Sequence, residues 1–344
     1  LDCFWWGAAF LVAVPIALVV LILGRVVLPE YRDPHGGRID LTSVGHSLAA
    51  ILLIIYAIKH VAGYGLDASA IAAVVIGTVA GVVFWRRQRR LTDPLLDVTL
   101  FRNKAFSVAL TVLLIGLVGV GGSMYLVTQY LQLVEGLSPF VAGLWMGPPA
   151  LAMFAAAIGA PLMARRIRPG YIMGGTLAIS LIGYLLLATA GLDDELTVAA
   201  GFAFAYLGLG AIAALGTDIV VGAAPASKSG SAASLSETVQ ELGIAIGVAI
   251  LGSLTTAVYR SQLTIPDTLS GDAAALTDSL SATMSIADQL PAGTLIEAQQ
   301  AFTTGMNIAS AAAGLAITVV TVLCLRMLRH LPRLDQTHQP DHIS

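Results

Sequence analysis

Long apolar runs separated by short polar gaps make up most of this chain. A helix needs about 20 residues to cross a hydrocarbon core of roughly 30 Å, and nine runs have about that length. Lipid cannot satisfy open backbone groups, and the runs lack the alternation of barrel strands, so each run predicts a helix. The predicted spans are 4–24, 41–64, 68–85, 105–133, 139–164, 171–190, 196–223, 232–259 and 302–325.

This pattern predicts an all-α, polytopic integral membrane protein with about nine transmembrane helices. The composition agrees, because hydrophobic residues make up 57% of the chain and charged residues only 11%. An ordinary soluble domain contains roughly 25% charged residues. A chain this apolar needs lipid as its solvent.

The charged residues are sorted by sign into alternate gaps. All of the 18 Lys and Arg except Lys59 and Arg260 fall in every second gap, and the acids fill most of the others. By the positive-inside rule the basic gaps face the cytoplasm. The basic residues therefore serve orientation, and we expect no nucleic-acid partner.

The number and ends of the spans predict an incomplete bundle. Nine is odd, so the two chain ends lie on opposite sides, and the basic tail 326–344 is expected to be cytoplasmic. The chain opens with Leu1, and three aromatic residues at 4–6 sit where an interfacial aromatic belt is expected. We therefore expect a fragment whose N-terminal helices are missing.

Two carboxylates lie inside the eighth span. Glu237 and Glu241 are four residues apart, which places them one turn apart on one face of a helix. Glu241 lies roughly 18 Å along the helix from Ser229 at about 1.5 Å per residue, near the bilayer midplane. An unpaired carboxylate there costs roughly 3 kcal/mol, so it is expected to face a bundle interior or a watery cavity and to exchange a proton. Helix capping, or pairing with a basic residue elsewhere, is the structural alternative.

A third acid lies near the inner end of the seventh span. Asp218 is a candidate for gating or proton relay, although it is close enough to the inner loop to reach water directly. Small residues at GxxxG spacing predict close helix contacts, at Gly143 and Gly147 in the fifth span and at Gly243 and Gly247 in the eighth.

The sequence contains no pattern typical of an enzyme or a metal site. Cys3 and Cys324 are solitary, and the six His residues form no close cluster at metal-ligand spacing. Neither a nucleophile elbow nor a glycine-rich phosphate loop is present. We expect no cofactor, no bound metal and no catalytic residue.

Several segments resemble the fourteen-helix drug:proton antiporters of the major facilitator superfamily, the EmrB/QacA group. They are FLVAVP at 10–15, PLLD at 94–97, LFRN at 100–103, QYLQ at 129–132, LSPFVAGL at 137–144 and SETVQELG at 236–243. The resemblance covers nearly the whole chain. It implies a partial major facilitator superfamily-like helix bundle in the cytoplasmic membrane of a bacterium.

The resemblance also implies a domain organisation. Residues 1–24 would be the last helix of an N-terminal bundle, and 25–104 two inserted linker helices with cytoplasmic segments. Residues 105–344 would form the C-terminal six-helix bundle, with the long extracytoplasmic loop 260–301 and the tail 326–344. Helical spacing of apolar residues in that loop predicts a short amphipathic helix or hairpin, a plain solvated loop being the alternative; the residues are Leu276, Leu280, Met284 and Ala287.

The function implied by the resemblance is export of lipophilic, often cationic, drugs in exchange for protons by alternating access. Glu237 and Glu241 would accept the proton and pair with the cation, with Asp218 assisting. The substrate cavity would be lined by Tyr125, Gln129, Met146, Met153 and Phe154. Each of these five is equally compatible with ordinary helix packing.

The implied partners are protons, a lipophilic small molecule, the bilayer and the missing N-terminal helices. Some members of the group carry a further acid in the helix that matches 139–164, and here that span has none, so recognition of doubly charged substrates is in doubt. The alternatives are a proton-coupled exporter of a siderophore, lipid or metabolite, and a fragment inactive on its own.

Overall fold

All regular elements of the described chain are helices. The structure is a computed structural model and describes residues 11, 13–27, 40–91, 94–263, 273–291 and 293–332. Eight helical spans in these ranges are long and apolar enough to cross a membrane, which confirms the all-α polytopic prediction. They are α3 (Leu41–Tyr64), α4 (Ala68–Gln88), α5 with its π-helical end η2 (Lys104–Val134), α6 with α7 (Pro139–Ala164), α8 (Pro169–Ala188), α9 (Glu195–Gly222), α10 (Ser229–Gln262) and α13 (Thr294–Met327).

The first predicted span is described only in part. Helix α2 (Ala13–Val27) covers its second half, and residues 1–10 lie outside the described residues. Contacts divide the chain into two compact units, Leu1–Asp40 and Leu41–Ser344. The second unit contains both the α3–α4 hairpin and the six following spans.

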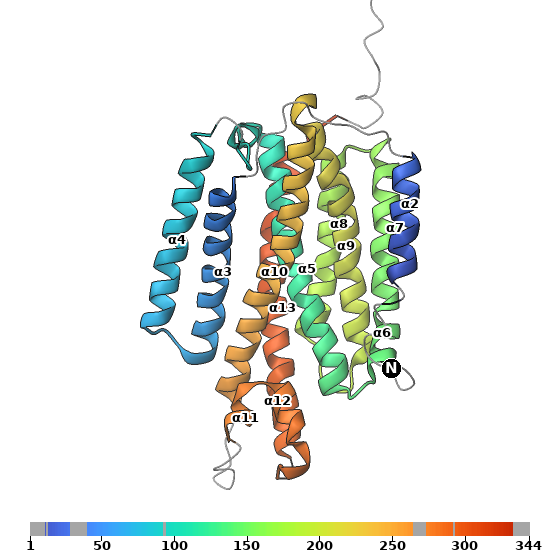
Figure 1. Cartoon of the computed structure of the whole chain (residues 1–344). Coiled ribbons are helices and arrows are strands. Elements are labelled where there is room, and N and C mark those ends of the chain that lie inside the picture. The colour runs from blue at the N-terminus through green and yellow to red at the C-terminus, as the bar shows by residue number, and fades with distance from the viewer. Residues whose placement is uncertain are drawn as a thin grey trace, which may run out of the picture. The chain divides into compact units, whose positions relative to one another are not determined.

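The six spans from α5 to α13 pack into one bundle (Figure 1). Helix α9 packs against α5, α7 and α8, while α13 packs against α5, α8 and α10. Helix α5 is the most enclosed, with 67% of its span buried, against 11% for the α6–α7 span. Large apolar side chains from α5, α8, α9 and α13 fill the core, among them Leu126, Tyr184, Phe202 and Met306.

The charges of this unit separate to its two ends, as the sequence predicts. The end formed by the last turn of α4, the first of α5 and the α9–α10 loop carries Arg86–Arg90, Lys104 and Lys228. We call it the basic end. The opposite end, here called the acidic end, carries Asp67, Glu135 and the acids that begin α9.

Glycine allows the closest helix contacts of the bundle. A Cβ built on Gly247 of α10 would lie 2.1 Å from the carbonyl oxygen of Val118 in α5, and one on Gly122 would lie 2.6 Å from the carbonyl of Gly247. Helix α9 meets α7 in the same way, because a Cβ on Gly210 would lie 2.1 Å from the Met153 carbonyl. Real Cβ atoms do not approach backbone so closely, so these crossings require glycine.

The two predicted GxxxG pairs have different outcomes. Gly243 and Gly247 lie in the α5–α10 contact, as predicted. The prediction for Gly143 and Gly147 is wrong within the described residues, because no atom lies within 4 Å of a Cβ built on either. The chain also breaks between them: α6 (Pro139–Trp145) ends there and α7 (Gly147–Ala164) starts with a proline in its first turn. A proline is tolerated at that position because its missing N–H has no intrahelical partner.

The α3–α4 hairpin is held together by small residues and closed by a capped turn. Ala70, Ala73, Gly77 and Ala80 form the buried face of α4 against α3, which in turn contacts α10. Asp67 caps α4 and accepts hydrogen bonds from Ala70 N (2.9 Å) and Ser69 Oγ (2.8 Å), with His60 Nε2 at 3.0 Å. These hydrogen bonds lower the pKa of Asp67 to about 2.

Arg260 breaks the positive-inside pattern, and its contacts explain why it is tolerated at the acidic end. Its Nε donates to the carbonyl of Thr277 at 2.8 Å, and a second nitrogen donates to the Gly63 carbonyl at the end of α3. Asp278 lies 3.5 Å away. The charge is therefore neutralised locally, and the side chain joins α10, α3 and the outer loop.

The outer loop contains two short helices, in line with the predicted amphipathic hairpin. These are α11 (Ala273–Asp278) and α12 (Leu280–Ser285), and Leu276 and Leu280 are their buried apolar residues. The hydroxyl of Tyr259, at the end of α10, donates to the Leu276 carbonyl at 3.1 Å. Residues 264–272 of the predicted loop lie outside the described residues.

Helix α5 ends in a π-helical turn, η2 (Tyr130–Val134), that is supported from α13. The side chain of Gln299 donates to the carbonyls of Leu133 and Val134, both at 3.1 Å. The Tyr130 hydroxyl donates to the Gly191 carbonyl at 2.7 Å. A π-turn leaves carbonyls without regular helix partners. The Gln299 amide satisfies two of these carbonyls, and the Tyr130 hydroxyl holds the turn against the Gly191 carbonyl.

The glycine contact between α5 and α10 leads to a stability prediction. Gly247→Ala forces a methyl group against the Val118 carbonyl, and we expect it to lower the free energy of unfolding by about 1–3 kcal/mol. The matched control is Gly143→Ala in α6, where the methyl meets open space and a helical alanine is favoured over glycine. Chemical denaturation in micelles measures both variants. Equal stability of the two would contradict the glycine-dependent contact.

Candidate functional site

The two predicted carboxylates lie on the exposed face of α10. Glu237 and Glu241 are both exposed, and Ser234, Thr238 and Ile244 continue the same stripe. The buried residues of α10, such as Gly243 and Gly247, turn to the other side, toward α5. The helical period thus separates a packing face from an open face that carries both acids.

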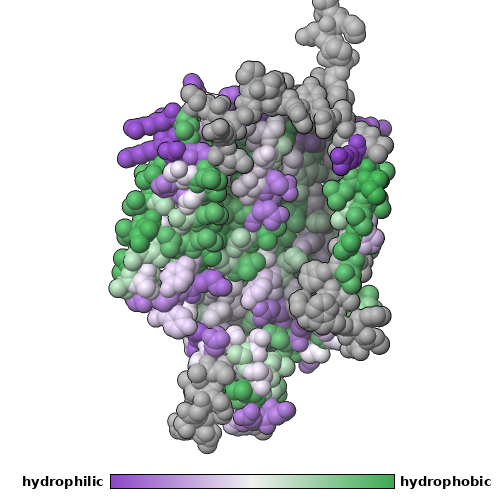
Figure 2. All heavy atoms as spheres, in the orientation of Figure 1, coloured by the Kyte–Doolittle hydropathy of each residue, from purple (hydrophilic) through white to green (hydrophobic). Residues whose placement is uncertain are grey.

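Polar side chains next to Glu237 in the sequence join α10 to α9. Ser236, next to Glu237, lies with its hydroxyl 3.3 Å from that of Thr217 in α9, and the amide of Gln240 donates to the Ser236 carbonyl at 3.3 Å. Asp218 follows Thr217 and is also exposed. Asp218 and Glu237 thus each follow a residue that makes this contact between α9 and α10. Figure 2 shows hydrophilic side chains over the upper half of α10, beside a hydrophobic surface.

Neither carboxylate of α10 is neutralised by another described residue. Among the described residues, no Lys, Arg or His forms an ion pair with Glu237 or Glu241, and no side chain donates a hydrogen bond to them. We expected each acid to face a bundle interior or a watery cavity. Neither faces the interior of the described six-helix unit, which is filled by apolar residues of α5 and α9. Both acids lie on its surface instead.

The five predicted cavity residues lie in separate parts of the bundle. Tyr125 in α5 is 41% exposed and packs beside Gly252 of α10, which lies roughly 16 Å along that helix from Glu241. Gln129 is half-buried close to the π-turn, and Met146 caps α6. Met153 is half-buried against α9, whereas Phe154 is 63% exposed. These side chains therefore do not converge on the acids within this unit.

Exposed aromatic and thioether side chains lie beside Tyr125. The hydroxyl of Tyr206 in α9 donates to the sulfur of Met124 in α5 at 3.2 Å, and Met124 and Tyr125 are both exposed. Phe154 is presented by α7, which also packs against α9. Tyr206 and Met124 were not predicted from the sequence, and only their aromatic and thioether character could have drawn attention to them.

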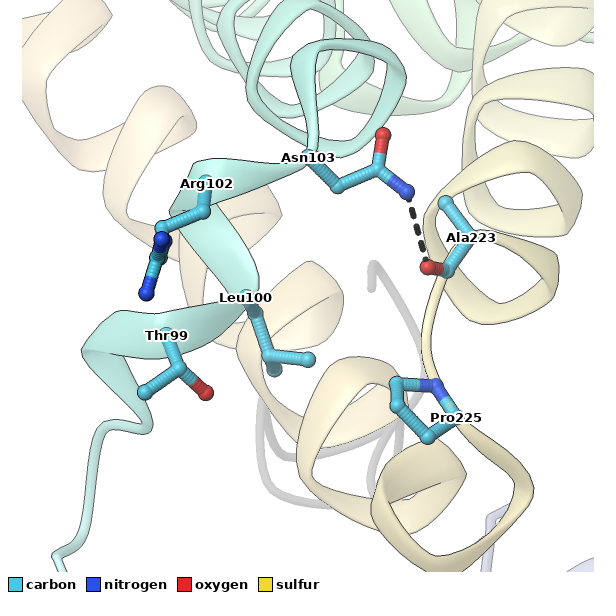
Figure 3. Close-up of a pocket in the computed structure, with 6 residues that line it drawn as sticks. All are labelled: Thr99, Leu100, Arg102, Asn103, Ala223 and Pro225. Atoms are coloured by element: carbon cyan, nitrogen blue, oxygen red, sulfur yellow. Dashed lines mark hydrogen bonds between the residues drawn. The ribbon is translucent and has the colours of Figure 1, made fainter.

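A shallow pocket of about 400 Å³ lies at the basic end, between the short helix η1 (Val98–Arg102) and the α9–α10 loop. Asn103 caps α5 and its amide donates to the carbonyl of Ala223 at 3.0 Å (Figure 3). Leu100 points into the space between the two segments, whereas Arg102 points away from it. The lining residues are Thr99, Leu100, Arg102, Asn103, Ala223 and Pro225.

An ion pair beside this pocket ties the segment before α5 to the start of α10. Lys228, the residue before α10, forms a salt bridge with Asp97 and donates to the Thr99 hydroxyl at 3.1 Å. Burial raises the pKa of Asp97, but hydrogen bonds from Lys228 and Thr99 outweigh it, and the net pKa lies below its ordinary value. The sequence signal for this pair was the presence of acids, Asp97 among them, within an otherwise basic gap.

The described part of the chain contains no group of three or more His, Cys, Asp or Glu placed to hold a metal ion. Cys324 is buried in α13 as a free thiol, and its sulfur lies 3.7 Å from the Gly170 carbonyl. Cys3 lies outside the described residues. The chemistry that these residues can offer is binding of cations and protons by carboxylates.

Together, the eight spans and the carboxylate-bearing α10 define a polytopic α-helical membrane protein. The Major Facilitator Superfamily matches residues 1–248, so the chain belongs to that family. It is therefore a multi-pass membrane protein, and its bacterial relatives indicate the plasma membrane.

Three relatives have names that state a role. The chain is 38% identical over 314 residues to the multidrug efflux pump LfrA of Mycolicibacterium smegmatis, covering 89% of this chain and 62% of LfrA. It is 28% identical to the methyl viologen resistance protein SmvA of Salmonella typhimurium (94% and 66%). It is 27% identical to the tetracenomycin C resistance and export protein of Streptomyces glaucescens (93% and 62%). The chain thus spans less than two thirds of the length of each.

The ion pair at the basic end predicts a pH-dependent stability. Because the folded pKa of Asp97 is lowered, its contribution is present above about pH 5 and is lost as the pH falls through that folded value. Asp97→Asn should therefore lower the free energy of unfolding by about 1 kcal/mol at neutral pH, and by less below about pH 4. Denaturation in micelles across this pH range measures the difference.

Two further variants make that result specific. Exchanging the charges, with Asp97→Lys and Lys228→Asp together, should recover part of the loss, because the pair is restored in reverse. Asp288→Asn, an exposed acid in the outer loop, serves as the control and should change little. A charge exchange less stable than either single variant would argue against the ion pair.

Proposed function

We propose that the protein exports lipophilic, cationic drugs or antiseptics in exchange for protons, by alternating access. The names of its relatives support drug efflux, since LfrA is a multidrug efflux pump and two others are named for resistance or export. The observation that carries the proposal is the pair of unneutralised carboxylates one turn apart on the open face of α10.

The physical argument starts from the position of these acids. They lie about 12 and 18 Å along α10 from its basic end at about 1.5 Å per residue, within an apolar span. A carboxylate at such a depth is costly unless it meets water, a cation or a proton. The described residues supply no fixed cation, so an exchangeable one fits the site. Proton and lipophilic cation then compete for the same oxygen atoms.

A transport cycle follows from this competition. In the inward-open state, an ionised Glu241 assisted by Glu237 binds the cation, while Asp218 lies nearer the basic end, on the path to water. A ligand shifts a conformational equilibrium only by its preference for one state, so bound cation must favour the change to the outward-open state. Protonation from outside then neutralises the carboxylate and releases the cation.

The exposed side chains around Met124 and Tyr125 suit a broad range of substrates. Aromatic faces attract cations, and thioethers adapt to many shapes. Tyr125, Gln129, Met146, Met153 and Phe154 remain our candidates for substrate contacts, although in this unit they do not close a cavity. We place the protein in the fourteen-helix antiporter branch, with α3 and α4 as its inserted pair.

Export of a metabolite made by the cell is the second candidate. It is favoured by the relative named as a probable actinorhodin transporter, which is 30% identical over 271 residues. A metabolite exporter would retain the same helices but would not depend on Glu241 for a cationic substrate.

Neutralising Glu241 tests the proposal. Glu241→Gln keeps the size of the side chain and removes the negative charge, so cells producing this variant should lose resistance to cationic dyes by roughly tenfold or more, as expected when one member of a charge pair is lost. Glu237→Gln should have a smaller effect. Minimum inhibitory concentrations, with protein levels checked by immunoblot, provide the measurement.

Glu297→Gln is the matched control, because Glu297 is also an exposed glutamate but lies in the first turn of α13 at the acidic end. It should leave resistance unchanged. Full resistance in the Glu241→Gln variant would exclude this carboxylate as the cation partner and would favour the second candidate.

Proton coupling has its own test. In proteoliposomes, a pH gradient should drive dye movement by the wild type, and collapsing the gradient with an ionophore should abolish it. The Glu241→Gln variant should show no gradient-dependent transport. Transport of equal rate with and without the gradient would refute antiport while leaving efflux itself intact.

A further inference from the structure

Helix α4 has an amphipathic exposed face that is distinct from the carboxylate region. Its buried face, formed by small residues, packs against α3, and only 22% of the span is buried. On the opposite side, residues at helical spacing are apolar and exposed: Val75, Ile76, Val79, Val82 and Val83. The same stripe continues into Arg86, Arg89 and Arg90, which are exposed as well.

The arginine end of this stripe is held in place by a buried glutamine. Gln88 is 2% exposed, and its amide donates to the Ser43 hydroxyl at 2.8 Å at the start of α3. Its side-chain oxygen accepts the Leu96 N–H at 3.0 Å. Gln88 points inward, whereas Arg86, Arg89 and Arg90 are exposed. Figure 2 shows hydrophilic side chains projecting at the top of α4, above a hydrophobic surface.

The charges of these three arginines are not neutralised by any described residue. Among the described residues, Arg86, Arg89 and Arg90 form no salt bridge and no side-chain hydrogen bond. Trp85 is 42% exposed and lies next to Arg86 at the same end of α4. Its ring contacts that of Phe101 edge-to-face, with 6.4 Å between the ring centroids. An exposed tryptophan beside basic residues at the end of an apolar span is typical of the headgroup region of a membrane.

We propose that this face of α4, from Val75 to Arg90, binds an anionic phospholipid. The headgroup phosphate pairs with Arg86, Arg89 and Arg90, and an acyl chain lies along the valines. The apolar stripe from Val75 to Arg86 is roughly 16 Å long at about 1.5 Å per residue, which is about half of a ~30 Å hydrocarbon core. A free phosphate would use only the arginines, whereas a phospholipid uses both parts of the stripe.

Lipid titration of the purified full chain in micelles tests this proposal without reference to transport. Native mass spectrometry should find phosphatidylglycerol bound in preference to phosphatidylcholine of the same acyl chains. Arg89→Gln with Arg90→Gln should reduce this preference by roughly tenfold, because each basic residue near a surface contributes to attraction of anionic lipid. Arg89→Lys with Arg90→Lys should retain most of it, since the charge is kept.

The matched control is Arg102→Gln with Lys104→Gln. These two residues are exposed at the same basic end, but they lie at the start of the enclosed helix α5, which has no apolar stripe open to lipid there. This variant should keep the preference for phosphatidylglycerol. Equal binding of the two lipids by the wild type, or an unchanged preference in the Arg89/Arg90 glutamine variant, would overturn the proposal. Displacement of the lipid by millimolar inorganic phosphate would identify an anion site instead, and would also overturn it.

Discussion

The bundle depends on backbone-to-backbone contact at glycine. In lipid, apolar side chains gain little by moving from acyl chains to a protein neighbour, so helix association depends on close packing. Where Gly247 of α10 meets Val118 and Gly122 of α5, the absence of a Cβ allows one helix to lie on the carbonyl groups of the other. Gly210 does the same for α9 and α7, and Gly183 for α8 and α9.

This packing decides where the functional acids point. Gly243 and Gly247 fix one face of α10 against α5, and the helical period then turns Glu237 and Glu241 away from the core. The acids are thus presented by a helix that is firmly seated on its opposite side. Such packing suits a carboxylate that must bind and release a proton, because the contact between α5 and α10 does not depend on the charge of the carboxylate.

Polar contacts at the two ends join the α3–α4 hairpin to α10. At the basic end, the side-chain oxygen of Gln88 accepts a hydrogen bond from the Leu96 N–H. The adjoining Asp97 pairs with Lys228 at the start of α10. At the acidic end, Arg260 reaches from α10 to the Gly63 carbonyl of α3. The hairpin is therefore attached along the helix that carries Glu241, and a lipid bound to α4 would act on a part of the protein connected to that helix.

The sequence by itself determined the helical spans, the separation of charge and the spacing of Glu237 and Glu241, because hydropathy and helical period are local properties. It did not distinguish Gly243 and Gly247, which pack, from Gly143 and Gly147, which do not, since spacing says nothing about which neighbour is present. The Asp97–Lys228 pair, the neutralisation of Arg260 and the exposure of the α10 acids were decided by tertiary structure. Each depends on segments far apart in the chain, and only the packed bundle brings those segments together.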